Sequence, residues 1–181
     1  EGRPSPYLKR KETYLIDNWS SDGTYELAKA IEGQGLVGIE RYPASGPTKV
    51  FQYRDILLRQ QQLASELTTD WVIRYDADER RRSPWPGVTL RDALYHIDRL
   101  GFSAVDHTQL TFHPVDDLFA QGMEMEAHFR HFEFERAGWA FSHVKAWKKT
   151  AHNVDLVSSA GHNVLFTGKR VFPYKFLLKH Y

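Results

Sequence analysis

Hydrophobic and polar residues follow one another along the chain in stretches that predict strands and helices in turn. β-prone runs with polar ends predict strands at residues 13–16 (TYLI), 36–42 (LVGIERY) and 71–75 (WVIRY). Apolar residues spaced along one helical face predict helices at 24–33, 53–67 and 89–101. A further extended segment is expected at 102–112 (FSAVDHTQLTF).

Strands that alternate with helices are typical of the α/β class. The pattern therefore predicts a mixed, mostly parallel sheet covered by helices. In such sheets, ligands bind beyond the carboxyl ends of the strands. Asp17 and Asp76 each come directly after an apolar strand. We therefore expect both acids on the same rim of one sheet.

The composition indicates one globular domain. The 181 residues are 41% hydrophobic and 14% aromatic, enough for one sizeable core, and we expect a single domain over residues 1–181. A formal net charge of +1, from 24 basic and 23 acidic residues, favours no nucleic-acid partner. No apolar run approaches the roughly 18–20 residues of a spanning helix, so we expect no transmembrane segment, and association with a membrane surface stays open. Cysteine is absent, which excludes disulfides and thiolate metal sites and is compatible with a cytoplasmic location.

The strand at 71–75 runs into a cluster of charges, in which Asp76, Asp78 and Glu79 precede three arginines. Carboxylates this close repel one another, so the arrangement needs a metal ion, basic partners or plain solvent. Taken alone, the segment fits two descriptions equally well. One is a solvated turn whose arginines screen the acids, and the other is a site for a metal-bound diphosphate.

Two motifs carry a resemblance to a known family. LIDNWSSDGTYELA resembles the motif that follows the second strand in family 2 glycosyltransferases, and WVIRYDADE resembles the Asp-x-Asp motif of the same GT-A superfamily. They occur in the expected order, with a strand and a helix between them. The resemblance covers residues 12–82, more loosely as far as Phe112, and the closing GHNVLF and KFLLKHY are similar to the end of such a domain. It implies the GT-A (Rossmann-like) fold.

The resemblance also implies a function. The protein would move a sugar from a nucleotide-diphosphate sugar donor to a glycan or other acceptor hydroxyl, with inversion, and would need Mn²⁺ or Mg²⁺ to balance the charge of the leaving diphosphate. Asp76 and Asp78 would serve the metal, with Asp76 also near the ribose. Arg80 is a candidate for phosphate contacts. Asp17 would bind the nucleoside, in a pocket shaped by Asn18, Ser20 and Asp22, although Asp22 is equally suited to cap the following helix.

Two roles have more than one candidate. A late histidine gives many such enzymes a further metal ligand, and His162 follows a small-residue turn, whereas His128 and His131 form an alternative cluster. An inverting transferase also needs a general base for the acceptor hydroxyl. The segment FHPVDDLF offers Asp116 and Asp117 for this role, and either one could instead cap a short helix.

Other functions stay open. A nucleotidyltransferase-like domain could use the same acids on a metal phosphate, and a degenerate glycosyltransferase-like module could bind a glycan or nucleotide without catalysis. The family fold starts with a central strand and helix before the strand at 13–16, and only twelve residues precede that strand here. We therefore expect either residues upstream of this numbering or direct pairing of 13–16 with 71–75.

Overall fold

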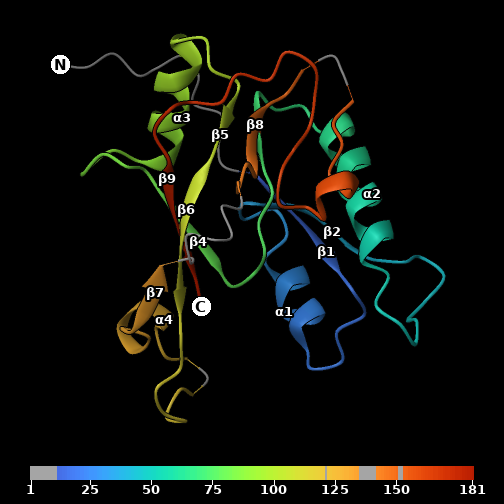
Figure 1. The fold of residues 1–181 in the computed structure, drawn as a ribbon. Helices are drawn as coiled ribbons and strands as arrows, with labels where there is room; N and C mark the ends of the chain where they lie inside the picture. Colours follow the sequence, from blue (N-terminus) through green and yellow to red (C-terminus); the bar gives the residue numbers. More distant parts are fainter. Residues whose placement is uncertain (1–11, 121, 135–141, 151–152) are drawn as a thin grey trace. The chain divides into compact units, whose positions relative to one another are not determined.

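The computed structural model describes residues 12–120, 122–134, 142–150 and 153–181 (Figure 1). The chain divides into two compact units, one ending at Ile56 and the other beginning at Leu57. Each unit is described by itself. The single domain expected over residues 1–181 stays a prediction.

The first unit contains a strand–helix–strand arrangement. β1 (Thr13–Asp17) and β2 (Leu36–Arg41) pair in parallel, with Leu15 opposite Ile39, and α1 (Thr24–Ala30) connects them. Gly38 of β2 lies against the ring of Tyr14, where an added Cβ would be 2.5 Å from the ring carbon Cε2. This close approach requires glycine at position 38. The unit ends within α2 (Tyr53–Glu66).

The second unit contains two small sheets. In the first, β3 (Trp71–Ile73), β8 (Ala146–Lys148) and β5 (Ala104–Val105) are all antiparallel, in the order β3-β8-β5. The second has the order β4-β9-β6-β7, and its members are β4 (Glu79–Arg82), β9 (Phe176–His180), β6 (His107–Phe112) and β7 (Phe132–Phe134). β6 and β9 pair in parallel, and the other two pairs are antiparallel.

The apolar core of the second unit forms under α3 (Leu90–Arg99). The hydroxyl of Thr89 accepts a hydrogen bond from the backbone N–H of Asp92 at 3.1 Å and so caps the start of this helix. The buried face of α3 packs on β5, β8 and the chain around β9, and the buried residues of this cluster are Leu90, Ala93, Leu94, Ile97, Val105, Ala146, Phe172 and Phe176. Trp85 adds edge-on ring contacts to Phe172 and Phe176.

The second sheet also buries polar side chains. Residues paired across strands share a face, and alternate residues along a strand share a face. The register places Glu79, Arg81, His107 and His180 on the same face as Phe176 and Leu178. Glu79, Arg81 and His107 are buried there. This face therefore carries a polar interior beside the apolar core.

Most local expectations are confirmed, and the mixed α/β class is confirmed with them. Helices form at Thr24–Ala30, Tyr53–Glu66 and Leu90–Arg99, and strands form at Thr13–Asp17, Leu36–Arg41 and Trp71–Ile73. The extended segment at 102–112 is two strands in two different sheets, because β5 pairs with β8 and β6 pairs with β9.

The expected sheet order differs from the described one. β1 pairs with β2, whereas β3 pairs with β8, so Asp17 and Asp76 do not follow strands of one sheet. Leu15 and Ile73 both lie in strands, but opposite Ile39 and Ala146 rather than each other. Four of the six strand pairs within the described ranges are antiparallel, so the mostly parallel pairing is not the observed one. The physical reason is that β3 is completed by β8, a strand more than 70 residues later in the chain.

Candidate functional site

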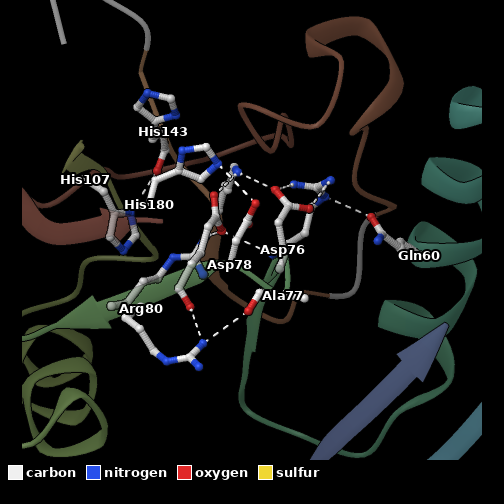
Figure 2. A network of polar contacts seen from close by, with 12 residues as sticks. Gln60, Asp76, Ala77, Asp78, Arg80, His107, His143 and His180 are labelled. Carbon is white, nitrogen blue, oxygen red and sulfur yellow. Dashed lines mark hydrogen bonds and ion pairs between the residues drawn. The ribbon is translucent and has the colours of Figure 1, made fainter. Parts of the chain in front are cut away.

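The acidic loop between β3 and β4 is closed on itself. The backbone N–H of Glu79 donates to the carbonyl of Asp76 at 3.0 Å, and the carboxylate of Glu79 accepts from the N–H of Asp76 at 3.2 Å. Figure 2 shows this loop with the basic and histidine side chains that surround it. The carboxylates of Asp76 and Glu79 both lie against Lys145, the residue directly before β8.

Basic and acidic side chains alternate through the loop in an ion chain, defined as Arg74–Asp76–Lys145–Glu79–Arg81. Arg74 Nη2 lies 3.0 Å from Asp76 Oδ1, and Lys145 Nζ lies 2.9 Å from Asp76 Oδ2. The same ammonium lies 2.5 Å from Glu79 Oε1, and Arg81 Nη2 lies 2.6 Å from Glu79 Oε2. Every carboxylate oxygen of the two acids therefore has a basic partner. Of the three expected means of compensation, a metal ion, basic partners or solvent, the structure uses basic partners for Asp76 and Glu79.

Burial makes the loss of one partner of these ion pairs costly. Lys145 is only 4% exposed and Glu79 only 2%, so neither charge has water to replace a lost partner. Asp76 is partly exposed. Burial acts to raise the pKa of Asp76, but the charges of Arg74 and Lys145 outweigh it and hold this pKa below its ordinary value. Asp76 is therefore ionised at neutral pH.

Asp78 has a different environment. Its Oδ2 lies 3.4 Å from Nε2 of His180 at the end of β9, and the N–H of Tyr181 donates to its backbone carbonyl at 3.1 Å. Asp78 Oδ1 and His180 Nδ1 are buried and have no hydrogen-bond partner among the described residues. Within the parts of the chain that the structure describes, Asp78 and His180 thus combine oxygen and imidazole donors with spare bonding capacity.

The histidines around the ion chain differ in role. His107 Nδ1 lies 2.8 Å from the backbone carbonyl of His143. Burial first, and then the charge of Arg81, lower the pKa of His107 to about 3, so its ring is neutral. The ring of His162 lies 5.7 Å from that of His143. Burial and the charge of Lys145 lower the pKa of His162, and Asp76 is near enough to oppose this effect.

Asp17 lies in the first unit and is satisfied locally. Its carboxylate accepts a hydrogen bond from the N–H of Ser20 at 3.1 Å and lies 3.6 Å from Nε of Arg41 on β2. Asn18 donates to the carbonyl of Tyr42 at 2.7 Å, and Asp22 accepts from the N–H of Thr24 at 3.0 Å. Asp22 thus supports the start of α1, while Gly23 occupies the N-cap position itself.

The remaining candidates are separate from the ion chain. Arg80 is exposed and donates to the backbone carbonyls of Ala77 and Glu79 at 3.2 and 3.1 Å. Asp116 accepts from the N–H of Leu118 at 2.9 Å and lies 3.2 Å from Nε2 of His128. Asp117 is exposed. Neither acid caps α4 (Met125–His128), whose N-cap residue is Glu124.

A metal ion fits only part of the predicted set. Among the described residues, no group of three or more His, Asp or Glu side chains is placed to hold a metal. Asp76 does not fit, because Arg74 and Lys145 occupy both of its oxygens. Asp78 and His180 do fit, because each has a buried polar atom without a partner. A diphosphate could supply the remaining oxygen ligands.

His180 is the residue that sequence reasoning missed. The segment KFLLKHY was noted as the end of a domain, but no spacing rule connects position 180 with position 78. Their proximity depends on the pairing of β4 with β9, in which Glu79 lies opposite His180.

A cavity of about 480 Å³ lies elsewhere in the second unit, between α2 and the chain that follows β8. Polar side chains of Gln61, Gln62 and Lys149 line it beside Trp147, and none of the candidate residues does. Gln61 and Lys149 already bond to backbone groups of the protein. This cavity and the ion chain are thus different places.

Comparison with known proteins adds no relative. No protein-family model matches the chain, and a search among curated proteins found no match. Over the described residues, no helix is both long and apolar enough to cross a membrane.

Proposed function

We propose that this protein is a metal-dependent glycosyltransferase with a GT-A-like nucleotide-binding region, which moves a sugar from a nucleotide-diphosphate sugar to an acceptor hydroxyl. The order of the two motifs supports the class. The observation that carries the proposal is the pairing of Asp78 with His180, each of which also has a buried polar atom without a partner among the described residues.

The residues have distinct parts in this proposal. Asp78 and His180 would hold Mn²⁺ or Mg²⁺, which when bound balances the charge of the leaving diphosphate. Arg74 and Lys145 hold the Asp76 carboxylate in one orientation at the rim of the site. In the first unit, hydrogen bonds of Asp17, Asn18, Ser20 and Asp22 fix the loop after β1, and the nucleoside role proposed for this loop rests on its motif alone.

A second candidate function has its own supporting observation. The ion chain neutralises Asp76 and Glu79 without a metal. This favours a non-catalytic module that binds a nucleotide or glycan through basic and aromatic groups. The two functions differ in whether divalent cation is needed for binding.

Calorimetric titration with UDP, GDP, dTDP and ADP, each with and without Mn²⁺, separates the two. The transferase proposal expects one diphosphate to bind at least tenfold more tightly with Mn²⁺. Asp78→Asn and His180→Asn should each remove this Mn²⁺ effect. Asp98→Asn, which alters an acid of α3 that pairs with Lys148, should keep it. Equal affinity with and without Mn²⁺ would favour the binding module. No binding of any diphosphate would remove the transferase function and would leave the module only as a glycan binder.

A further inference from the structure

Asp116 and His128 form a carboxylate–imidazole pair. Asp116 Oδ1 lies 3.2 Å from Nε2 of His128 and also accepts from the N–H of Leu118, which fixes the carboxylate. The imidazole ring packs against two aromatic rings, with centroids 5.4 Å from Phe119 and 4.9 Å from Phe129, and these two rings also contact each other at 5.0 Å. The side chain of His128 remains 17% exposed. The ring is therefore oriented and still reachable from solvent.

Aromatic contacts connect this pair to the end of β9. Phe129 lies 6.1 Å from the ring of Tyr181, which stacks on Phe112 at 4.7 Å. The N–H of Tyr181 donates to the carbonyl of Asp78, and the neighbouring His180 pairs with the Asp78 carboxylate. In Figure 1, α4 and β7 lie beside the carboxyl end of the chain. The pair and the Asp78–His180 site are thus at the same end of the β4–β9–β6–β7 sheet.

We propose that His128 is the general base that deprotonates the acceptor hydroxyl, with Asp116 as its positioning residue; this assignment rests on the proposed transferase function. With Nε2 donating to Asp116, Nδ1 is the nitrogen left to accept a proton. The arrangement follows the logic of a carboxylate that fixes the tautomer of a catalytic imidazole.

The step balances without a further reactant. His128 Nδ1 takes the hydroxyl proton while the acceptor oxygen forms a bond to the anomeric carbon. The bond from that carbon to the diphosphate oxygen breaks, and the diphosphate leaves with the electron pair. The imidazolium is stabilised by the Asp116 carboxylate and then returns its proton to water. Glu126, the acid of α4, is already paired with Arg82 and Lys179.

The surface around the pair indicates a neutral sugar as acceptor. Phe119, Phe132 and Phe134 are exposed and offer flat apolar faces. Asp117, next to Asp116 in the sequence, is exposed and can accept hydrogen bonds from hydroxyl groups. Over residues 113–134 the sequence has five acids and one arginine. Although Arg82 and Lys179 pair with one of these acids, Glu126, the remaining acids still outnumber the arginine, which disfavours a phosphorylated or otherwise anionic acceptor.

The chain offers a matched control for the assignment. His113 and Glu133 form a pair of the same kind, with Nε2 and Oε1 3.2 Å apart, but the His113 side chain is 52% exposed. A purely structural role for histidine–carboxylate pairs would make the two substitutions similar. A catalytic role would make only His128 essential.

The test uses the full chain with UDP-glucose, GDP-mannose and dTDP-glucose as donors, Mn²⁺, and either water or methyl β-glucoside as acceptor. His128→Gln should lower kcat by about 10²–10⁴-fold, the usual contribution of a general base, while nucleotide affinity measured by calorimetry stays unchanged. Asp116→Asn should lower kcat with KM unchanged and should displace the acidic limb of the pH–kcat profile. In His128→Gln that limb should disappear, and His113→Gln should match the wild type.

Wild-type kcat and an intact acidic limb in a folded His128→Gln variant would overturn the assignment while leaving the transferase function in place. Loss of turnover in Asp116→Asn but not in His128→Gln would make Asp116 itself the base, which also overturns it. A wild type that binds no nucleotide with Mn²⁺ would instead remove the transferase function, and the base assignment with it.

Discussion

Lys145 is the residue on which the charged loop depends most. Its ammonium is shared by Asp76 and Glu79 and is almost fully buried. Lys145→Met should destabilise the fold by about 3–5 kcal/mol, the usual cost of removing one partner of a buried ion pair. Lys148→Met, three residues further along the chain in β8, is the matched control, because Lys148 pairs with Asp98 at 2.5 Å but is 44% exposed. We expect at most about 1 kcal/mol there.

Urea unfolding of both variants measures this difference. An equal loss of unfolding free energy in the two variants would show that burial of Lys145 does not raise the cost of removing it. A loss in Lys145→Met that persists when Glu79→Gln is combined with it would show that the stranded carboxylate is not the source.

His107 predicts how stability changes with pH. Its pKa is about 3 in the folded protein and about 6.5 in an unfolded chain, so the unfolded state binds the proton more readily. The stability that depends on a neutral His107 is therefore fully present above pH 6.5. The free energy of unfolding then decreases by about 1.4 kcal/mol for each pH unit below this value. The lowered pKa of His162 adds a loss in the same direction.

Urea unfolding at intervals from pH 7 to pH 4.5 tests this dependence. Asp76 has a lowered pKa, so its contribution to stability is lost only below its ordinary pKa of 3.8. A change in stability between pH 7 and pH 4.5 is therefore assigned to the histidines. His107→Gln should be less stable at pH 7 but should show a flatter pH dependence. A slope as steep as that of the wild type would rule out His107 as the buried titrating group.

The chemistry of the loop was only partly predictable at this scale. The spacing of Asp76, Asp78 and Glu79 correctly indicated that something must compensate their charges. Which compensation is used depends on Lys145, which is 66 residues from Glu79 along the chain. The roles of Asp78 and His180 depend equally on a long-range pairing. No local pattern contains either contact.

Among the elements, β2 makes the sharpest prediction. Gly38→Ala would place a Cβ 2.5 Å from the ring of Tyr14 on β1, so the two strands must shift apart or the ring must move. Overpacking of this kind typically costs about 1–3 kcal/mol. Val37→Ala, at a neighbouring exposed position of the same strand, should change stability by no more than about 0.5 kcal/mol.

Combining Gly38→Ala with Tyr14→Leu tests the cause, with the free energy of unfolding as the readout. The smaller side chain should recover part of the loss, so the two effects should be non-additive. Strict additivity in the double variant would place the cost in the backbone of β2 instead.

Elements with a clear period were predictable, and short ones were not. α2 and α3 have apolar residues at helical spacing over 14 and 10 residues. β3, β5, β7 and β8 have only two or three residues each, too few to show a period of two. β4 has the sequence ERRR, which shows no apolar alternation, because its two buried residues, Glu79 and Arg81, are charged like the exposed Arg80 and Arg82.

At the scale of the molecule, the two compact units predict separate local stabilities. In every described strand pair, both strands belong to the same unit. Gly38→Ala should therefore raise amide hydrogen exchange in residues 13–41 and leave β4, β6, β8 and β9 unchanged. Exchange measured by mass spectrometry reports both regions at once, and faster exchange in both would show that the chain opens as one cooperative body.

The arrangement of the sheets could not be predicted from the alternation of strands and helices. That alternation holds from β1 to β3 and suggests a parallel sheet. The partners of the later strands come from β8 and β9, near the end of the chain. The pattern thus gives the class of fold, while the order of strands depends on contacts between distant residues.

The alternating charges of the ion chain also constrain how this protein can change in evolution. Replacing Lys145 alone leaves two acids without a shared cation, and replacing Glu79 alone leaves Arg81 buried without its anion. Neutral drift should therefore pass through paired substitutions at positions 79, 81 and 145, rather than single ones. Sequences of related proteins should show correlated changes at these three positions, and at position 74 whenever position 76 loses its acid.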